Sequence, residues 1–453
     1  MITVSKEEAG RKIFFVARPG FEPRPSEPES DILPLYYRAK EAAKITIIIF
    51  TLSSFLTSFE ENFYNMTKAM QPTMRWFGPN DPVSLKDIKQ SDATGVVTAL
   101  HHIPHGEVWP ITEIEKRKNE IESAGLTWTV VESVTVHESI KTRTNNFQQY
   151  IDWYKETIRN LSQYGIKVIT YNFMPVNDWT RTTLDYLMPD DSKALYFNWF
   201  DLAVFDIYML ERPNAKYDYN ENILQEAEKR FKSYSEEELE ELSRVIRFGI
   251  PGEKKLTIPE MRKALEAYKE IDHSALRENL KYFLQQVTPV AEECGVKLAV
   301  HPDDPPFDIL GLPRICRTAE DLDYILSAVD NTANGICFCT GSLGANPNND
   351  LVAMIRRVDK RLHFAHLRNT KRDAFGNFFE DDHLAGDTDM YAVVKEMLKI
   401  QQEVDGPIPF RPDHGHQMMD DMQKNNNPGY SGIGRMKGLS ELRGLMLGIS
   451  RSV

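Results

Sequence analysis

Four short segments toward the C-terminal end decide the fold, because each has the composition of a β-strand that stops on a side chain able to bind a metal ion. They are KLAVH (297–301), GICFC (335–339), RLHFAH (361–366) and PIPFRPD (407–413), and they end at His301, Cys339, His366 and Asp413. A helix-like stretch separates each segment from the next. Since parallel strands present their carboxyl ends at one face, we expect these four side chains to form one metal site.

The same alternation of strand and helix extends back toward the N-terminus. Runs rich in β-branched and aromatic residues occur at 73–78, 94–100, 127–134 and 167–173. Helical stretches with apolar residues three or four positions apart lie between them, and several end at a glycine. Eight strands that alternate with helices predict a closed parallel (β/α)8 barrel of the TIM type. A doubly wound open sheet is the alternative, but no glycine-rich phosphate loop follows the first strand.

One interval is too long for a single connection between a strand and the next helix. Residues 174–274 lie between the fourth and fifth strands and are rich in charged helix formers, as in SYSEEELEELSRVIRF (233–248). A connection of this length usually carries structure of its own, and the loops that follow barrel strands surround the active site. We therefore expect a helical insertion over the barrel mouth.

Residues 1–72 have no place in this pattern, so we assign the catalytic barrel to residues 73–453. The stretch from Pro19 to Ala39 is rich in proline and should be extended or disordered. The codons for Gly20 to Pro23 can also match the T-loop of a tRNA gene, in which case translation would begin at Met66, Met70 or Met74. A genuine disordered extension and a start codon assigned too early are both left open.

The composition argues against several classes of protein. The 453 residues are 41% apolar and 27% charged, as in soluble globular proteins. A net charge of −13 argues against nucleic acid or an anionic membrane as partner, because both attract basic surfaces. The most apolar run, residues 45–56, is too short to cross a bilayer. Four cysteines in so long a chain do not make a disulfide framework, so we expect a cytoplasmic protein.

The ligand types indicate which metal ion would bind. Two imidazoles, a thiolate and a carboxylate suit Fe(II), Mn(II) or Zn(II) better than Mg²⁺ or Ca²⁺, which prefer oxygen ligands. A structural zinc site is not expected, since the sequence has no paired CxxC motif. Cys337 lies two residues before Cys339 on the same face of its strand, so we place it in the core, one layer below the site.

Residues near the four ligands could carry the chemistry. His414 directly follows Asp413, so it can approach a substrate and exchange a proton near neutral pH. Tyr430 lies in a turn-rich loop, NNNPGYSGIGR (425–435), and could act as a base next to a metal. Polar and aromatic residues at strand ends and in loops are candidates for substrate binding, with arginine as the natural partner of a carboxylate. These candidates are Arg75, Trp76, His101, Asn172, Arg314 and Arg372.

Longer motifs resemble one known family, the D-mannonate dehydratases of hexuronate breakdown. The matching runs include MRWFGPNDPVSL (74–85), VHPDDPPFDILGLPR (300–314), FAHLRNT (364–370), RPDHGHQMMDD (411–421) and NPGYSGIGRMKGL (427–439). The resemblance extends from about Met74 to the C-terminus and leaves out the residues before it.

This resemblance implies a xylose-isomerase-like TIM barrel that binds Mn²⁺ or Fe²⁺ and converts D-mannonate to 2-keto-3-deoxy-D-gluconate and water. The four strand-end residues would bind the metal, and His414 and Tyr430 would be the acid–base pair. We assign Tyr430 as the base and His414 as the acid, with the reverse assignment open. The alternatives are a metal-dependent sugar isomerase and a non-catalytic barrel that binds sugar acids. We also expect a homo-oligomer.

Overall fold

The computed structural model describes residues 2–8, 11–17, 69–248 and 255–452. The chain forms two units, residues 1–67 and residues 68–453. In the first unit, β1 (Ile2–Glu8) and β2 (Arg11–Ala17) pair as an antiparallel hairpin, which the sequence pattern did not predict. The proline-rich stretch 19–39 and Met66 lie outside the described residues. The interpretation of residues 1–72 as an extension outside the barrel therefore stays a prediction.

Eight parallel strands of the second unit close into a barrel, which confirms the (β/α)8 fold predicted from the sequence. The strands follow one another around the barrel in sequence order, and the eighth pairs with the first. They are β3 (Gln71–Arg75), β4 (Gly95–Thr98), β5 (Thr127–Glu132), β6 (Val168–Tyr171), β9 (Lys297–Val300), β10 (Asn334–Cys339), β11 (Leu362–His366) and β14 (Pro409–Arg411).

Apolar side chains fill the barrel interior. Side chains alternate between the two faces of a strand, so every second residue points inward. The inward-facing apolar residues that pack together are Val97, Val130, Val168, Ala299, Cys337 and Phe364. Cys337 is thus in the core below Cys339, as predicted. The opposite face of the strands, with Val96, Val131 and Ile169, packs against the helices in a larger core.

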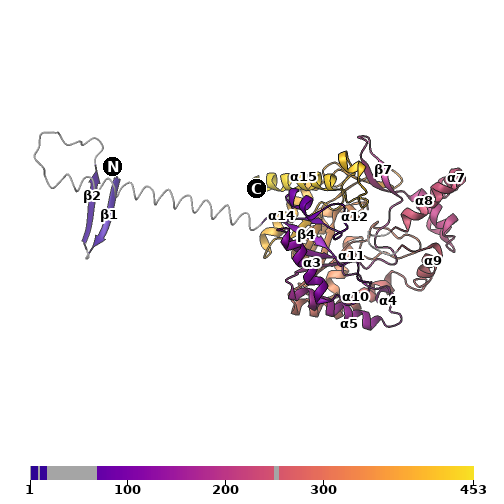
Figure 1. Cartoon of the computed structure of the whole chain (residues 1–453), viewed down its shortest axis with the longest axis horizontal. Helices are drawn as coiled ribbons and strands as arrows, with labels where there is room; N and C mark the ends of the chain where they lie inside the picture. Colours follow the sequence, from indigo (N-terminus) through magenta and orange to yellow (C-terminus); the bar gives the residue numbers. More distant parts are fainter. Residues whose placement is uncertain (1, 9–10, 18–68, 249–254, 453) are drawn as a thin grey trace, which may run out of the picture. The chain divides into compact units, whose positions relative to one another are not determined.

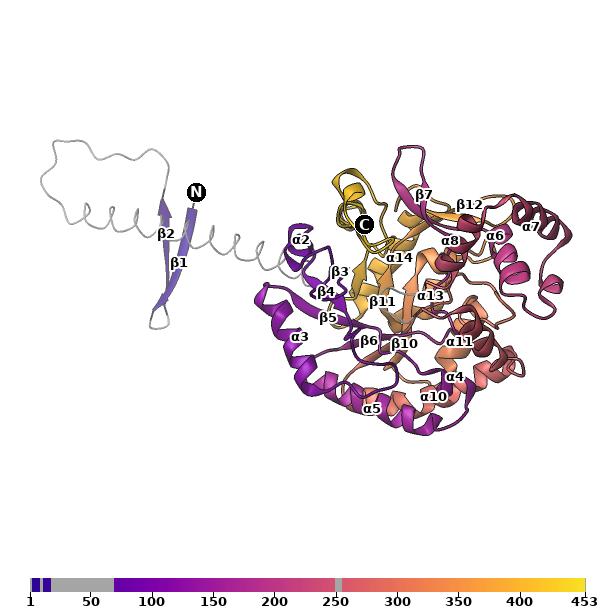
Figure 2. The same cartoon turned by 45° about the vertical axis from the view of Figure 1, so that its right-hand side comes forward.

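Helices cover the outside of the barrel, and Figures 1 and 2 show α3, α5 and α10 wrapped around it. Each of these three ends before a glycine with positive φ (Gly125, Gly165 and Gly295), a conformation that glycine adopts without strain. No helix in the described part of the chain is long and apolar enough to cross a membrane. The helices outside the insertion are α2 (Leu85–Gln90), α3 (Ile111–Ser123), α4 (Glu138–Thr142), α5 (Phe147–Gln163), α10 (His273–Glu293), α11 (Ala319–Ala328), α12 (Thr340–Gly344), α13 (Leu351–Val358), α14 (Met390–Glu403) and α15 (Gly432–Ser450).

The insertion after β6 is mainly helical, as predicted, but it begins with a β-hairpin that the sequence analysis missed. The hairpin strands β7 (Thr183–Leu187) and β8 (Lys193–Phe197) join β12 (Asn369–Arg372) and β13 (Phe378–Asp381) in an antiparallel sheet of order β12-β13-β8-β7. Figure 1 shows α7, α8 and α9 gathered away from α3 and α5. The insertion helices are α6 (Trp199–Val204), α7 (Glu221–Ser233), α8 (Glu236–Ile246) and α9 (Ile258–Glu266), and they pack around a core of their own.

Removal of the residues before Met70 should leave the barrel folded, whereas removal through Thr73 should destabilise it. The Thr73 hydroxyl donates to the Phe410 carbonyl at 2.7 Å, and the Gln71 amide donates to the Ile408 carbonyl at 2.9 Å. A chain that begins at Met74, one of the starts that the sequence suggested, lacks these contacts between β3 and its neighbours.

We expect a chain that begins at Met70 to unfold at the temperature of the full-length protein in a thermal melt. A chain that begins at Met74 should unfold at a lower temperature or be insoluble. Equal melting temperatures for the two truncated proteins would show that the first strand needs no residues before Met74.

Candidate active site

Three of the four predicted ligands converge at the carboxyl end of the barrel. His301 follows β9, Cys339 ends β10 and His366 ends β11. The ligand atoms of the three side chains all lie within 4.8 Å of one another, and His301 Nε2 is 3.1 Å from His366 Nδ1. Cys339 and His366 are register partners on neighbouring strands. The barrel therefore brings together side chains that are far apart in the sequence.

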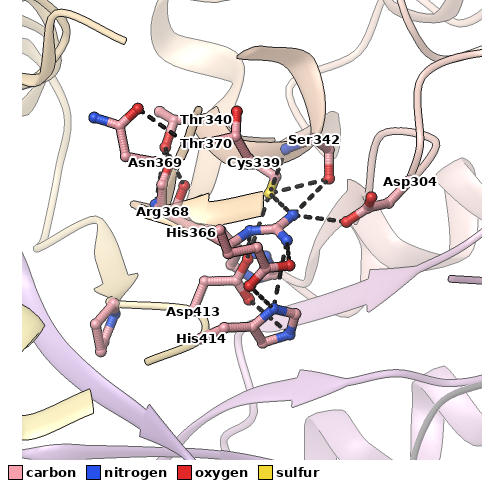
Figure 3. Close-up of polar contacts among 12 residues, drawn as sticks. Asp304, Cys339, Thr340, Ser342, His366, Arg368, Asn369, Thr370, Asp413 and His414 are labelled. Atoms are coloured by element: carbon pink, nitrogen blue, oxygen red, sulfur yellow. Dashed lines mark hydrogen bonds and ion pairs between the residues drawn. The ribbon is translucent and has the colours of Figure 1, made fainter. Parts of the chain in front are cut away.

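Asp413, the fourth predicted ligand, lies beside this group (Figure 3). Its carboxylate oxygens are 3.6 Å from Cys339 Sγ and 3.7 Å from His366 Nδ1. Atoms that share one ion through bonds of about 2.0–2.3 Å lie on the order of 3–4 Å apart. The group of two imidazoles and a thiol, with a carboxylate near two of its members, has the donor types of a single divalent transition-metal ion.

The surroundings of Cys339 favour the thiolate. Burial opposes a charge on the sulfur, and so does the carboxylate of Asp413, but Arg368 and the two imidazoles outweigh both and hold the pKa of the thiol well below its usual range. Arg368 Nη2 lies 3.7 Å from Sγ, and the Ser342 hydroxyl donates to Sγ at 3.2 Å. The thiolate is the form of cysteine that binds metal.

Two buried arginines hold Asp413 in place. Arg368 Nε is 2.9 Å from one carboxylate oxygen, and Arg411 Nη1 is 2.6 Å from the other. Although burial disfavours the charge, Arg411, His414 and Arg368 hold the pKa of Asp413 well below its usual range. Asp413 also has a φ of +62°, a left-handed conformation that costs on the order of 1 kcal/mol for a residue other than glycine. The ion pairs with Arg368 and Arg411 stabilise Asp413 in this conformation.

Glu132, at the end of β5, lines the cavity of the candidate ligands and lies next to His366 and Arg411. Arg411 donates to the two Glu132 oxygens at 2.9 and 3.1 Å, and Arg75 Nη1 is 3.0 Å from the same carboxylate. His366 Nε2 lies 3.5 Å from Glu132 Oε2. Arg411 Nε lies closer to His366 Nε2, at 3.0 Å, so Glu132 and Arg411 together fix the orientation of this imidazole.

Arg368 also joins the metal site to a second group of buried charges, and Figure 3 shows it reaching from Asp413 to Asp304. Its Nη2 is 2.6 Å from Asp304, and its Nη1 donates to Glu380. Arg181 pairs with the same two carboxylates at 2.7 Å from each. All four residues are at most 3% exposed, so each charge depends on its partners.

Sequence reasoning missed this network, although one signal was available. Arg368 lies two residues after His366, and Arg411 lies two residues before Asp413. Strand periodicity therefore places each arginine on the face of a predicted ligand. Glu380 and Arg181 have no such signal, because both come from segments outside the barrel strands.

His414 and Tyr430 lie together on the cavity that contains the ligands, and the same cavity is lined by His301 and Asp413. Their ring centroids are 4.8 Å apart at an interplanar angle of 78°. Burial raises the pKa of the Tyr430 phenol, although Arg411 and Arg75 act in the opposite direction. His414 Nδ1 is 2.7 Å from Glu380 Oε2. The structure thus brings the predicted acid–base pair to the predicted metal site.

The structure places three of the six predicted substrate-binding residues at the mouth of the barrel. Asn172 and Arg75 line the cavity of the metal site, and His101 lines an adjoining cavity that shares Arg75. Arg75 Nε and His101 Nε2 are buried and have no hydrogen-bond partner among the described residues. Such atoms are suited to receive a polar ligand, because a buried polar group without a partner is costly.

Trp76, Arg314 and Arg372 were also predicted to bind substrate, but they are not among the residues that line either cavity. Trp76 is buried in the core with the Arg117 guanidinium over its ring. Arg314 is fully buried and donates to the Asn177 carbonyl at 3.2 and 3.3 Å, and Arg372 donates to the Gly344 carbonyl. Strand-end position and charge alone did not show where these side chains point.

A closed parallel barrel whose carboxyl end carries a group of side chains able to bind a metal ion, beside a buried histidine and tyrosine, is typical of the (β/α)8-barrel enzymes. Comparison with known proteins shows which family within this class the chain resembles. The model of the D-mannonate dehydratase (UxuA) family matches residues 70–453. The chain belongs to this family.

Individual members of the family are similar to this chain in sequence over almost their whole length. The chain is 50% identical over 391 residues to the mannonate dehydratase of Marinomonas sp. (strain MWYL1), which covers 85% of this chain and 100% of that protein. It is 47% identical to the mannonate dehydratase of Saccharophagus degradans over 83% of this chain and 97% of the relative. The crystal structure of mannonate dehydratase from Streptococcus suis serotype 2 superimposes with a TM-score of 0.69 at 36% identity, over 85% of this chain and 94% of that one.

The thiol of Cys339 should be needed to hold a divalent ion. Replacement by serine preserves the size of the side chain but exchanges a readily ionised thiol for a hydroxyl that stays protonated. We expect Cys339→Ser to lose most of its bound metal, measured by elemental analysis after equilibration with limiting Mn²⁺. Cys337→Ala, which removes a thiol one layer deeper, is the matched control and should keep its metal. Equal metal content in Cys339→Ser and the unmodified protein would remove Cys339 from the ligand set.

Proposed function

We propose that the chain is a divalent-metal-dependent D-mannonate dehydratase, a hydro-lyase that converts D-mannonate to 2-dehydro-3-deoxy-D-gluconate and water. One observation carries the proposal in a chain of this family. His301 and Asp413 line the same cavity as His414 and Tyr430, and His301 belongs to the group of metal-ligand side chains with Cys339 and His366. Groups suited to metal binding and to proton transfer therefore lie at one cavity.

The reaction breaks two bonds on neighbouring carbons. A base removes the proton from C2, and an acid protonates the hydroxyl on C3, which leaves as water. The resulting enol then becomes the 2-keto product when its hydroxyl proton is lost and C3 takes up a proton. A carbon-bound proton next to a carboxylate is a weak acid, so the site must stabilise negative charge as it develops and hold both proton-transfer groups close to the substrate.

The four ligands would hold Mn²⁺ or Fe²⁺, which suit a mixture of imidazole, thiolate and carboxylate donors. When bound, such an ion supplies a Lewis acid for the charge that develops near C1 and C2. Glu132 and the two arginines that contact Asp413 keep the ligands in position. Arg75 Nε and His101 Nε2 are available to bind the carboxylate or hydroxyl groups of the substrate. His101 is neutral near pH 7, because burial and nearby Arg75 lower its pKa to about 3.

The balance of buried charge favours a sugar acid over the neutral sugar of an isomerase. Five buried cations and five carboxylates at or next to the cavity compensate one another (Arg75, Arg181, Arg368, Arg411, Lys141; Glu132, Asp304, Glu380, Asp413, Asp178). A divalent ion together with the Cys339 thiolate would add one net positive charge. The single carboxylate of an aldonate would balance that charge in a site where unpaired charges are costly.

Two features now favour His414 as the base and Tyr430 as the acid, the reverse of our assignment from the sequence. Burial raises the pKa of Tyr430, so its phenol keeps a proton that it can give to the departing hydroxyl. His414 has a carboxylate partner at Nδ1, which stabilises the positive charge that the imidazole gains when it accepts a proton.

We extend the proposal to the setting of the enzyme. All four cysteines are free thiols, which agrees with a reducing cytoplasm. We also propose that the substrate comes from hexuronate breakdown and that the protein assembles as a homo-oligomer. No nucleic acid or membrane partner is proposed, because the chain carries a net charge of −13.

One assay tests the activity. The protein loaded with Mn²⁺ or Fe²⁺ should convert D-mannonate to a 2-keto-3-deoxy acid, detected by the colour reaction of that product with thiobarbiturate. Chelation should abolish turnover, and either ion should restore it. Full activity with an empty metal site would refute metal dependence, and isomerisation of a neutral aldose without activity on D-mannonate would favour the isomerase instead.

The acid–base pair should be separable from the metal ligands. His414→Asn and Tyr430→Phe should keep the metal but lose about 10²–10⁴-fold in kcat, the usual contribution of a general acid or base. A C2-deuterated substrate assigns the roles, because weakening the base makes C2 proton removal more rate-limiting. A larger isotope effect is therefore expected in His414→Asn than in Tyr430→Phe, and the opposite order would restore Tyr430 as the base.

A further inference from the structure

We infer that Glu380 is a positioning residue that acts through His414 and determines which imidazole nitrogen faces the substrate. The inference rests on the proposed function, since it assigns His414 a role in proton transfer. Glu380 lies on β13, outside the eight strands of the barrel, and none of the sequence motifs pointed to it.

The contact between the two side chains is short and buried. Glu380 Oε2 is 2.7 Å from His414 Nδ1, and the two residues are 3% and 7% exposed. Arg368 Nη1 is the other polar atom near this nitrogen, at 3.4 Å. The carboxylate contact is much shorter and therefore decides the state of Nδ1, because 3.4 Å lies outside the usual hydrogen-bond range of about 2.7–3.2 Å.

Glu380 lies behind His414 as seen from the metal site. His414 lines the cavity that contains His301, Asp413 and Tyr430, whereas Glu380 is not among the residues that line it. Glu380 instead lines a second cavity on the far side of His414, together with Arg368 and Lys437. Glu380 therefore does not face the substrate, and any effect on the reaction must pass through its neighbours.

The two oxygens of Glu380 have different partners. Oε1 accepts from Arg181 Nη2 at 2.7 Å, from Arg181 Nε at 3.2 Å and from Arg368 Nη1. Oε2 is left to His414. Burial opposes ionisation, but Arg368, His414 and Arg181 lower the pKa of Glu380 to about 2, so the group is a carboxylate at neutral pH.

A carboxylate that faces Nδ1 requires a proton on that nitrogen, because an ionised carboxylate can only accept hydrogen bonds. In the neutral imidazole the proton is then absent from Nε2, which becomes the acceptor that faces the cavity. His414 Nε2 makes no short contact with Asp413, whose Oδ1 lies 3.9 Å away. The nitrogen is free to take a proton from the substrate.

The position of Glu380 depends on the insertion. β13 pairs with β8 through Phe378↔Phe197 and Phe379↔Tyr196, so a strand from the insertion after β6 supports the strand that carries Glu380. Arg181, at the start of the same insertion, holds Oε1. The insertion therefore contributes to the active site by fixing the residue that orients His414.

Replacement of Glu380 by glutamine tests the inference. The arginines require an acceptor, so the amide oxygen would stay at the Oε1 position and the amide NH₂ would face His414 Nδ1. That arrangement forces the proton onto Nε2 and removes the acceptor from the cavity. We expect Glu380→Gln to lose about 10²–10⁴-fold in kcat on D-mannonate, with KM and metal content changed less than about threefold.

A double-mutant cycle with His414→Asn separates positioning from a structural role. If Glu380 acts through His414, the loss caused by Glu380→Gln should disappear when His414 is already asparagine. Asp381→Asn, on the same strand with its side chain on the other face, is the matched control and should keep the kcat of the unmodified protein. Glu380→Asp, which keeps the charge, should recover part of the rate.

Two results would overturn the inference. One is an equal fold-loss from Glu380→Gln in both backgrounds, and the other is loss of metal in step with loss of rate. If Glu380→Gln does not fold, Glu380→Asp goes through the same cycle, and additive losses there would also overturn it. Absence of activity on D-mannonate in the unmodified, metal-loaded protein would instead refute the proposed function, so the two failures are distinct.

Discussion

The catalytic end of this barrel depends on one buried guanidinium, that of Arg368. It contacts Asp413 beside the metal site, Asp304 in the loop after β9 and Glu380 on β13, and it lies near the sulfur of Cys339. Each of those groups would be costly to bury without a partner, because removal of one member of a buried ion pair typically costs about 3–5 kcal/mol. Arg368 therefore links the candidate metal ligands Cys339 and Asp413 to Glu380 and to Asp304, and a change in one of these groups affects the others.

This constraint explains why the residues outside the barrel strands matter. A (β/α)8 barrel supplies the metal ligands from its own strand ends, since the strands deliver side chains to one face. It does not supply the environment of the acid–base pair. That environment comes from a small antiparallel sheet built from two separate connections, one after β6 and one after β11. The sheet adds Glu380, and the insertion adds Arg181, so the proposed proton transfer depends on residues outside the barrel strands.

The site also illustrates how buried charge can carry specificity. The buried cations and carboxylates at the cavity balance one another, and a divalent ion paired with a thiolate would leave a single positive charge for the substrate to neutralise. A neutral sugar would leave that charge unbalanced in a cavity lined by buried groups. Positive groups that are already in place also stabilise negative charge that develops during a reaction, because they need not rearrange to do so.

The barrel could be predicted from the amino-acid sequence, because the alternation of apolar strands and amphipathic helices is a local property that the spacing of residues shows. The sequence also indicated the types of metal-ligand side chain and predicted that they lie together. The carboxyl ends of the strands in a parallel barrel all lie at the same face, so His301, Cys339, His366 and Asp413 were expected at one site. The hairpin at β7 and β8 was not predicted, because its short alternation is weaker than the helical signal of the rest of the insertion. The fold was needed to see that Trp76, Arg314 and Arg372 do not line the two cavities, that Arg411 lines the cavity of the candidate metal ligands, and that Arg368 and Glu380 lie next to its residues. The direction of a buried charged side chain depends on partners from distant segments, and those partners are known only once the chain has folded.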